Sequence, residues 1–443
     1  MAIGAVLSQQ WSLLLSLAAI MALWWAWRVL ELAWITPRRL GRALRAQGLR
    51  GRAYRFPFGD LQEFSRLVAV ARRLANGLVS HDGEKWAAHR RIINPAFHLE
   101  KLKKMMPAFV ACCNELVTRW EDHVGSDEAK EMDVWPEFQN LTGDVISRAA
   151  FGSSFTEGRR IFQIQSEQAQ NVMKMFLPMR LNRRVKANAR EVESLLKGII
   201  GKREKAMKDG NDLLGVLMEC NAAEMKQAGS SRPIMTMDDI IGELKLFYFA
   251  GMDTTAVLLT WTLVALSMHP EWQDRAREEV LRVFGNKDQP DLDGINQLKV
   301  VSMVLHEVLR LYPPVIQFDR QTYAEVELGG VRYPPGVILS LPIVFLHHDP
   351  DVWGEDADEF RPERFAEGVS KASGSSSSPA FFPFGWGPRV CVGQNFALIE
   401  AKMALSRILQ RFEFGLSPSY RHAPFPVSTL QPDHGAPILL KKL

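Results

Sequence analysis

A lone cysteine in a glycine-rich segment, directly before a long predicted helix, constrains this chain more than any other feature. The segment runs from Phe384 to Gly393 with the pattern F-x-x-G-x-R-x-C-x-G, in which the cysteine is Cys391. Glycines let the backbone approach a flat ligand closely, and free N–H groups at a helix start favour the thiolate form that ligates metals. The alternative is a small buried cysteine in a turn, which is common for a single cysteine.

Composition and charge are those of an ordinary globular protein, with 47% hydrophobic and 23% charged residues among 443. The net charge of +4 is too small and too scattered to indicate binding to nucleic acid. The cysteines have neither the spacing of a disulfide framework nor that of a CxxC metal site. Such thiols fit a reducing compartment; they are Cys112, Cys113, Cys220 and Cys391.

The N-terminal segment is predicted to cross a membrane once. Residues 11–27 are uncharged and mostly apolar, and with the flanks to Ile35 they can span a bilayer of about 30 Å. No lysine or arginine precedes the run, whereas seven arginines follow within residues 38–55, which places the rest of the chain in the cytosol. A cleaved signal peptide is the alternative, but such peptides usually have a basic start and a shorter apolar region.

The rest of the chain is predicted to be mainly helical, with a small amount of β-structure and no internal repeat. Short strands around a Gly329-Gly330 turn are expected between Asp319 and Pro342. The serine-rich composition of residues 368–379 predicts a surface loop.

The most prominent predicted helix begins near Thr236 with a capping-box pattern and ends near His269. About 32 residues at ~1.5 Å each give ~48 Å, enough to cross a domain, and the apolar second half predicts burial. Residues 250–255 in its middle read A-G-M-D-T-T. A buried acid beside hydroxyl groups costs free energy unless it is hydrogen-bonded, so a functional role is one interpretation. The alternative is a helix-bending threonine that bonds back to a carbonyl one turn earlier.

An acid and a base at i and i+3, Glu307 and Arg310, precede a proline pair on another predicted helix. This spacing places both charges on one helical face. For an isolated E-x-x-R the usual interpretation is a solvated surface pair. The position before the prolines, and upstream of F-R-P-E-R-F at residues 360–365, makes that interpretation less favourable here.

These motifs resemble those of the cytochrome P-450 monooxygenases, from about Gly77 to the C-terminus. The resemblance implies a mainly α fold with a small β-rich side around one haem b, preceded by one transmembrane helix. Cys391 would be the axial haem ligand, and therefore the metal ligand, in the loop that begins at Phe384. A thiolate ligand donates electron density to iron and favours O–O cleavage.

The resemblance also assigns residues around the haem. Ala250 and Gly251 would admit dioxygen between helix and haem, Thr254 would hydrogen-bond the oxygen being activated, and Asp253 would help relay protons from solvent. Haem propionates would be held by a set of polar side chains, with the i, i+4 pair on one helical face: Arg389, Trp86, Arg90 and Arg320.

Two further groups follow from the resemblance. A buried triad that stabilises the fold around the haem loop would consist of Glu307, Arg310 and Arg364. A basic cluster on the helix after Trp86 would be either a docking surface for an acidic reductase or a solvated face; it comprises Lys101, Lys103 and Lys104.

Longer strings indicate a branch of the family. Residues 83–98, 245–251 and 417–420 resemble plant microsomal enzymes of the secologanin-synthase-like branch, which includes relatives acting on triterpenoids, brassinosteroids and gibberellins. This implies a single-pass enzyme of the endoplasmic reticulum membrane with a cytosolic catalytic domain. It would hydroxylate a lipophilic terpenoid- or hormone-like molecule, using dioxygen and electrons from an NADPH–cytochrome reductase.

The chain departs from the family before Trp86, where it is short by some tens of residues, and less so around residues 173–178. The predicted organisation is a membrane anchor at 1–35, a basic linker and shortened region at 36–76, and a haem-thiolate catalytic domain at 77–443. Lost strands would expose sheet edges, and a lost lid would admit water. The alternatives are therefore a haem-binding but catalytically impaired family member, or a non-haem interaction protein that retains the helices.

Overall fold

The fold comes from a computed structural model that describes residues 2–49, 77–126, 128–152, 180–206, 212–227, 234–287, 289–373 and 379–443, and parts of 158–167. The predicted shortfalls, before Trp86 and around residues 173–178, lie outside the described residues. The chain divides into two compact units, residues 1–68 with 319–341 and residues 69–318 with 342–443, which are described separately. The predicted three-part organisation stays a prediction.

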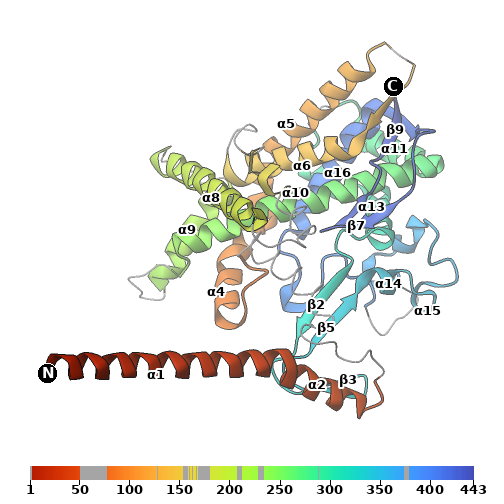
Figure 1. The fold of residues 1–443 in the computed structure, drawn as a ribbon. Coiled ribbons are helices and arrows are strands. Elements are labelled where there is room, and N and C mark those ends of the chain that lie inside the picture. Colours follow the sequence, from red (N-terminus) through yellow and green to blue (C-terminus); the bar gives the residue numbers. More distant parts are fainter. Residues whose placement is uncertain are drawn as a thin grey trace. The chain divides into compact units, whose positions relative to one another are not determined.

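The first unit begins with a long helix, α1 (Ala2–Leu30), which continues through the π-helical turn η1 (Glu31–Ile35) into α2 (Thr36–Arg45) (Figure 1). A helix therefore forms where the anchor was expected, with its large apolar side chains exposed between Leu17 and Leu30. Exposure of such a stretch is what a lipid-facing helix requires. The membrane span itself stays a prediction.

The strands expected between Asp319 and Pro342 are present. β3 (Val326–Leu328) and β4 (Val331–Tyr333) form an antiparallel hairpin, and β2 (Gln317–Gln321) pairs with β5 (Ile338–Pro342). Gly329 and Gly330 form the hairpin turn at φ values of 57° and 74°, a region that glycine adopts without steric cost.

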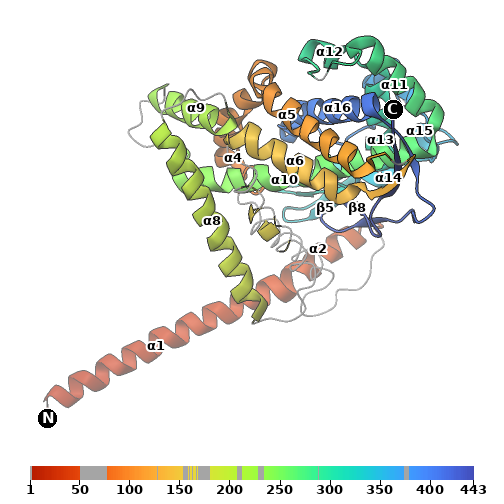
Figure 2. The same cartoon turned by 90° about the horizontal axis from the view of Figure 1, so that it is seen from above.

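The second unit is built on α10 (Met237–Met268), which is buried along most of its length. Its capping box pairs Thr236 with Asp239, and the helix ends at His269, as predicted. It packs against α6 (Val134–Phe151), α13 (Lys299–Leu311) and α16 (Gln394–Arg411) (Figures 1 and 2). Among the described residues, α10 is the helix long and apolar enough to cross a membrane, but 78% of that stretch is buried inside the protein. It is therefore the core helix of the unit.

The other helices of this unit pack against α10, against α16 or against one another. α5 packs against both α6 and α16. The α-helices are α4 (Gly83–Ile93), α5 (Leu99–Val124), α8 (Arg180–Ala206), α9 (Leu213–Gln227), α11 (Pro270–Phe284), α12 (Leu292–Gln297), α14 (Ile343–His347) and α15 (Pro350–Trp353). The 3-10 turns are η2 (Asn94–Phe97), η3 (Pro362–Phe365), η4 (Val369–Lys371) and η5 (Gly387–Arg389).

Two small sheets complete the second unit. One is antiparallel in the order β1-β9-β6, from β1 (Lys130–Asp133), β6 (Phe412–Leu416) and β9 (Pro437–Lys442). The other pairs β7 (Pro424–Pro426) with β8 (Leu430–Pro432). The prediction of a mainly α fold with a small β-rich part is confirmed, although no sequence signal had located these C-terminal strands.

Candidate active site

The segment around Cys391 forms a tight loop directly before α16. Gly385 and Gly387 adopt φ values of 75° and 72°, which favour glycine. The N–H of Cys391 donates to the carbonyl of Phe384 at 2.8 Å and closes the loop. Gly393 is the N-cap residue of α16. The cysteine is thus held two residues before a helix start.

Cys391 is the exposed cysteine of the chain, whereas Cys112 and Cys113 are buried and Cys220 is half-buried. Although the residue is exposed, burial of its thiol against the loop raises the pKa of Cys391, and a hydrogen bond from the N–H of Gly393 and the charge of Arg90 oppose this. The helix start therefore favours the thiolate, as expected, but by itself it does not outweigh burial. A bound metal cation supplies the missing stabilisation of a coordinating thiolate.

Helix α4 presents Trp86 and Arg90 to the cysteine loop. Arg90 Nη1 donates to the carbonyl of Val390 at 2.7 Å, and the guanidinium of Arg389 lies over the indole of Trp86, 4.7 Å from the ring centroid. Cation–π contact of this kind holds an arginine in place without neutralising its charge. Four of the predicted haem-site residues are thus brought together.

The residue that completes this group was not predicted. Arg389 Nη2 donates to Asp82 Oδ1 at 2.8 Å, and both of its terminal nitrogens donate to the carbonyl of His81 at 3.1 Å. Asp82 is exposed. Asp82 thus gives Arg389 an anionic partner that is open to solvent.

Thr254 and Asp253 lie one after the other in the middle of α10 but face different partners. Thr254 Oγ1 donates to the carbonyl of Ala250 at 2.7 Å, the back-bonded geometry of the alternative interpretation. Asp253 is buried and accepts hydrogen bonds at 2.7–3.3 Å from three side chains near β8: Thr429, Ser428 and Gln431. Burial raises the pKa of Asp253, and these three hydrogen bonds oppose it.

Gly251 has a packing reason to be a glycine. A Cβ built at this position would lie 3.1 Å from Cδ1 of Ile146 on α6. At the same contact between α6 and α10, the hydroxyl of Thr142 donates to the carbonyl of Met252 at 2.9 Å. Close packing against α6 therefore fixes the position of residues 250–254, independently of any ligand.

Glu307, Arg310 and Arg364 form one cluster, in which Glu307 and Arg310 are buried and Arg364 is half-buried. Arg310 and Glu307 make two parallel hydrogen bonds at 2.7 and 2.9 Å, and neither side chain is exposed. Arg364 Nε lies 3.5 Å from Glu307 Oε1. The remaining N–H groups of Arg310 donate to three backbone carbonyls, those of His347, Ala357 and Glu359. The interpretation of Glu307 and Arg310 as a solvated surface pair is therefore wrong.

The remaining predicted residues lie elsewhere. Arg320 is on β2 in the first unit, so its role as a propionate ligand stays a prediction. The three lysines lie in the first turns of α5, where Lys103 and Lys104 are exposed and Lys101 is half-buried.

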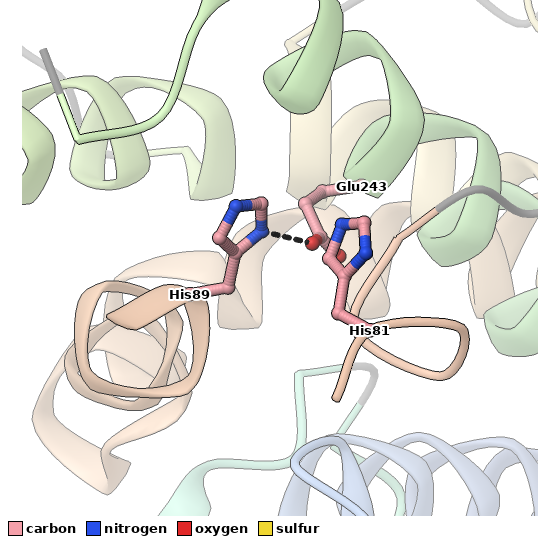
Figure 3. Close-up of side chains that lie close together, drawn as sticks. All are labelled: His81, His89 and Glu243. Carbon is pink, nitrogen blue, oxygen red and sulfur yellow. Dashed lines mark hydrogen bonds and ion pairs between the residues drawn. The ribbon is translucent and has the colours of Figure 1, made fainter. Parts of the chain in front are cut away.

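A second group of polar side chains carries no sequence signal. His81, His89 and Glu243 converge at the contact between α4 and α10 (Figure 3). Because 154 residues separate His89 from Glu243, no local spacing could have indicated this group.

Comparisons with known proteins place the chain. The sequence model described as cytochrome P-450 matches residues 59–434. CYP72A616 of Paris polyphylla is 51% identical over 513 residues, covering 97% of this chain and 99% of that protein. CYP72A219 of Panax ginseng is 44% identical over 508 residues, with 96% and 98% covered. The 11-oxo-beta-amyrin 30-oxidase of Glycyrrhiza uralensis is 51% identical over 402 residues, covering 87% of this chain and 76% of that protein.

The match to CYP72A616 also bears on the length of the chain. It extends over 513 positions, whereas this chain has 443 residues, so at least 70 of those positions have no residue of this chain. The family assignment nevertheless rests on nearly the whole chain and does not favour a catalytically impaired protein or a non-haem interaction protein. The chain belongs to the cytochrome P-450 family, as a monooxygenase of the plant CYP72 branch that uses a haem iron, dioxygen, a small-molecule substrate and a redox partner.

Proposed function

We propose that this protein hydroxylates a lipophilic terpenoid- or hormone-like molecule at the endoplasmic reticulum membrane, with electrons from an NADPH–cytochrome reductase. Support for the terpenoid class comes from the oxidase of Glycyrrhiza uralensis, whose name specifies 11-oxo-beta-amyrin as the molecule it oxidises. The same name is carried by a relative in Medicago truncatula that is also 51% identical.

The observation that carries the proposal is the cysteine loop with its two arginines. Cys391 is exposed at the start of α16, with Arg90 and Arg389 beside it and Trp86 under the second guanidinium. These residues fit haem b: a thiolate for the iron and two guanidinium groups for the propionates. Arg389 would exchange the carboxylate of Asp82 for a propionate.

Bound haem would supply the activation of dioxygen, and the protein would supply proton delivery and shape. We assign proton transfer to the hydroxyl of Thr254, which has to leave the carbonyl of Ala250 to donate elsewhere. Asp253 would help relay protons from solvent, and burial raises its pKa. Its contacts with Thr429 and Ser428 orient the carboxyl group from the β8 side.

Two features support the membrane and reductase proposals. The apolar side chains of α1 are exposed from Leu17 onward, as a helix in lipid would have them. The basic cluster Lys101, Lys103 and Lys104 lies on α5, which packs against the helix that follows Cys391. A positive surface there would attract an acidic reductase.

Replacing the proposed ligand tests the assignment. In Cys391→His the reduced carbon-monoxide complex should lose its thiolate-type absorption even where haem is retained, because only a thiolate gives that electronic signature. Cys220→Ser, at a half-buried cysteine on α9, is the matched control and should keep the wild-type spectrum. An unchanged spectrum in Cys391→His would show that another residue is the ligand.

Thr254→Ala tests the proton route. Haem binding should survive, while electron use separates from product formation and peroxide is released, with coupling lowered about 10- to 100-fold. Thr262→Ala is a matched control, because Thr262 makes the same back-bond on α10, to the carbonyl of Leu258 at 2.7 Å. Equal coupling in Thr254→Ala and wild type would exclude the proposed route.

A further inference from the structure

Three buried side chains from separate segments meet at one point between α4 and α10. His81 lies in the turn before α4, His89 lies on α4 and Glu243 lies in the second turn of α10. One ligand atom from each falls within 4.8 Å of the others. Figure 3 shows the three side chains together, with the hydrogen bond between His89 and Glu243, and the two imidazole rings lie edge to face with their centroids 4.6 Å apart.

The protein satisfies only part of this cluster. Glu243 accepts from His89 Nδ1 at 2.7 Å and from the N–H of Leu78 at 2.9 Å. The Nε2 atoms of both histidines are buried, and no described residue hydrogen-bonds to them. A buried polar nitrogen without a partner costs about 1–3 kcal/mol, so the Nε2 atom of His81 calls for a ligand. The Nε2 atom of His89 faces Asp239 Oδ1 at 3.9 Å, and its Nδ1 atom faces the cluster.

We propose that His81, His89 and Glu243 bind a divalent transition metal of the zinc class, separate from the haem. Two imidazoles and one carboxylate are an established ligand set for Zn²⁺, with a water in the fourth position. Neutral imidazole is the ligating form. Burial and the charge of Lys85 lower the pKa of His81, which keeps its ring neutral at pH 7.

The cluster needs only a small rearrangement to close on the ion. Zinc bonds of 2.0–2.1 Å space tetrahedral ligand atoms by about 3.4 Å, so a 4.8 Å spread must contract by roughly 1.4 Å. The proton now shared between His89 Nδ1 and Glu243 would be displaced to Nε2 or to solvent, because the metal takes its place.

The carboxylate of Asp239 lies near the second ring nitrogen of His89, where it could orient a metal-bound ring. Asp239 Oδ1 lies 3.9 Å from His89 Nε2, and Lys85 Nζ holds the same oxygen at 2.6 Å. Metal-bound histidines usually donate their second N–H to such a carboxylate, which orients the ring. Burial favours a higher pKa for Asp239, but hydrogen bonds from Lys85 and Thr236 outweigh burial and lower the pKa to about 2. Asp239 is therefore ionised at neutral pH.

The backbone around the site is adapted to this close approach. A Cβ at Gly77 would lie 2.6 Å from Glu243 Oε2, so a larger residue at this position would have to displace the carboxylate. The turn leads into His81 and Asp82, the two acceptors of Arg389. A metal at this site would link the turn and α4 to α10. It would thereby restrict the motion of His81 and Asp82, which accept hydrogen bonds from Arg389.

The test uses the full-length, haem-loaded protein in detergent, with Zn²⁺ alone as the probe. We expect one saturable equivalent of zinc in competition with a chromophoric chelator. Zinc-edge X-ray absorption should show nitrogen and oxygen ligands and no sulfur, which separates this site from Cys391. His81→Gln and Glu243→Gln should each weaken binding at least about tenfold.

Two controls separate loss of zinc binding from loss of the fold and from binding at exposed histidines. His81→Gln removes a ligand whose Nε2 makes no described hydrogen bond, so its haem spectrum and melting temperature without zinc should match wild type. His434→Ala, at an exposed histidine, should bind zinc as wild type does. The proposal is overturned if wild type binds no stoichiometric zinc, if sulfur appears in the first shell, or if both cluster variants keep wild-type affinity. None of these readouts depends on monooxygenase activity.

Discussion

Two buried carboxylates in this protein, Glu307 and Glu243, stand in opposite situations. Glu307 takes two hydrogen bonds from Arg310 and one from the N–H of Arg361. Both terminal nitrogens of Arg310 also donate to backbone carbonyls. Glu243 is equally buried, but the imidazoles around it keep two nitrogens without described partners.

The difference separates a cluster that holds the fold from one that can hold a ligand. In the Glu307–Arg310 pair every side-chain N–H group of Arg310 and both oxygens of Glu307 are used, so the pair has no donor or acceptor left for a ligand. Removing either member leaves a buried charge alone. An incomplete network retains the chemical capacity to bind, at a cost in stability while it is empty. The haem site is intermediate, since Arg389 is paired with a carboxylate that is itself exposed.

The largest effect is expected for Arg310→Lys. Lysine keeps the charge but has only three donors on one nitrogen, so it cannot serve Glu307 and three carbonyls together. We expect a loss of about 3–5 kcal/mol and protein that fails to retain haem, measured by haem content and chemical unfolding. Arg332→Lys, in an exposed pair with Glu327, should change stability by less than about 0.5 kcal/mol. Similar losses of stability in Arg310→Lys and Arg332→Lys would contradict the distinction between a buried, fully hydrogen-bonded pair and an exposed one.

An intermediate effect is expected for Arg389→Ala. The chain should fold, because the partners of Arg389 are a carbonyl and an exposed carboxylate rather than a closed network. Haem should be held about 10- to 100-fold less firmly, the equivalent of about 1.5–3 kcal/mol for a lost charge-assisted hydrogen bond. Haem transfer to apomyoglobin measures this. Wild-type haem retention in Arg389→Ala would show that Arg389 does not hold the haem. Loss of the fold would instead place Arg389 with Arg310, as a residue that holds the fold.

The smallest effect concerns Glu400 on α16, another buried carboxyl group, for which no described residue is a hydrogen-bond partner to either oxygen. Burial raises the pKa of Glu400 well above its ordinary value. The folded chain therefore binds this proton more tightly than the unfolded chain does. The resulting stability is present below the unfolded pKa of about 4.3 and is lost as the pH rises through the folded value.

Glu400→Gln should remove this pH dependence. We expect the variant to gain about 1 kcal/mol over wild type at pH 8 and little or nothing at pH 4.5, measured by denaturant unfolding of the haem-loaded proteins. Glu413→Gln, at an exposed carboxylate on β6, should show no such trend. A constant difference across the pH range would mean that Glu400 is not strained by burial.

Local signals were sufficient for much of the fold. The capping box at Thr236, the glycine pair at 329–330 and the uncharged run within α1 each act over a few residues, so the sequence predicted these elements correctly. The C-terminal strands escaped prediction for two reasons. β6 and β9 gain partners only when segments distant in the sequence pair, and the short strands β7 and β8 flank residues 427–429, which contain no glycine turn.

By itself the sequence determined the cysteine loop, the α10 motif and the acid–base pair of α13, because their chemistry depends on spacing within one helix or turn. Only the tertiary structure decided which groups complete each site. Asp82 meets Arg389 across 307 positions, Thr429 meets Asp253 across 176, and Glu243 meets His89 across 154. Burial removes water as a partner for Asp253, Glu243 and His89, whereas Asp82 stays exposed. The residues that packing brings near each group therefore decide whether it is satisfied, displaceable or free to bind.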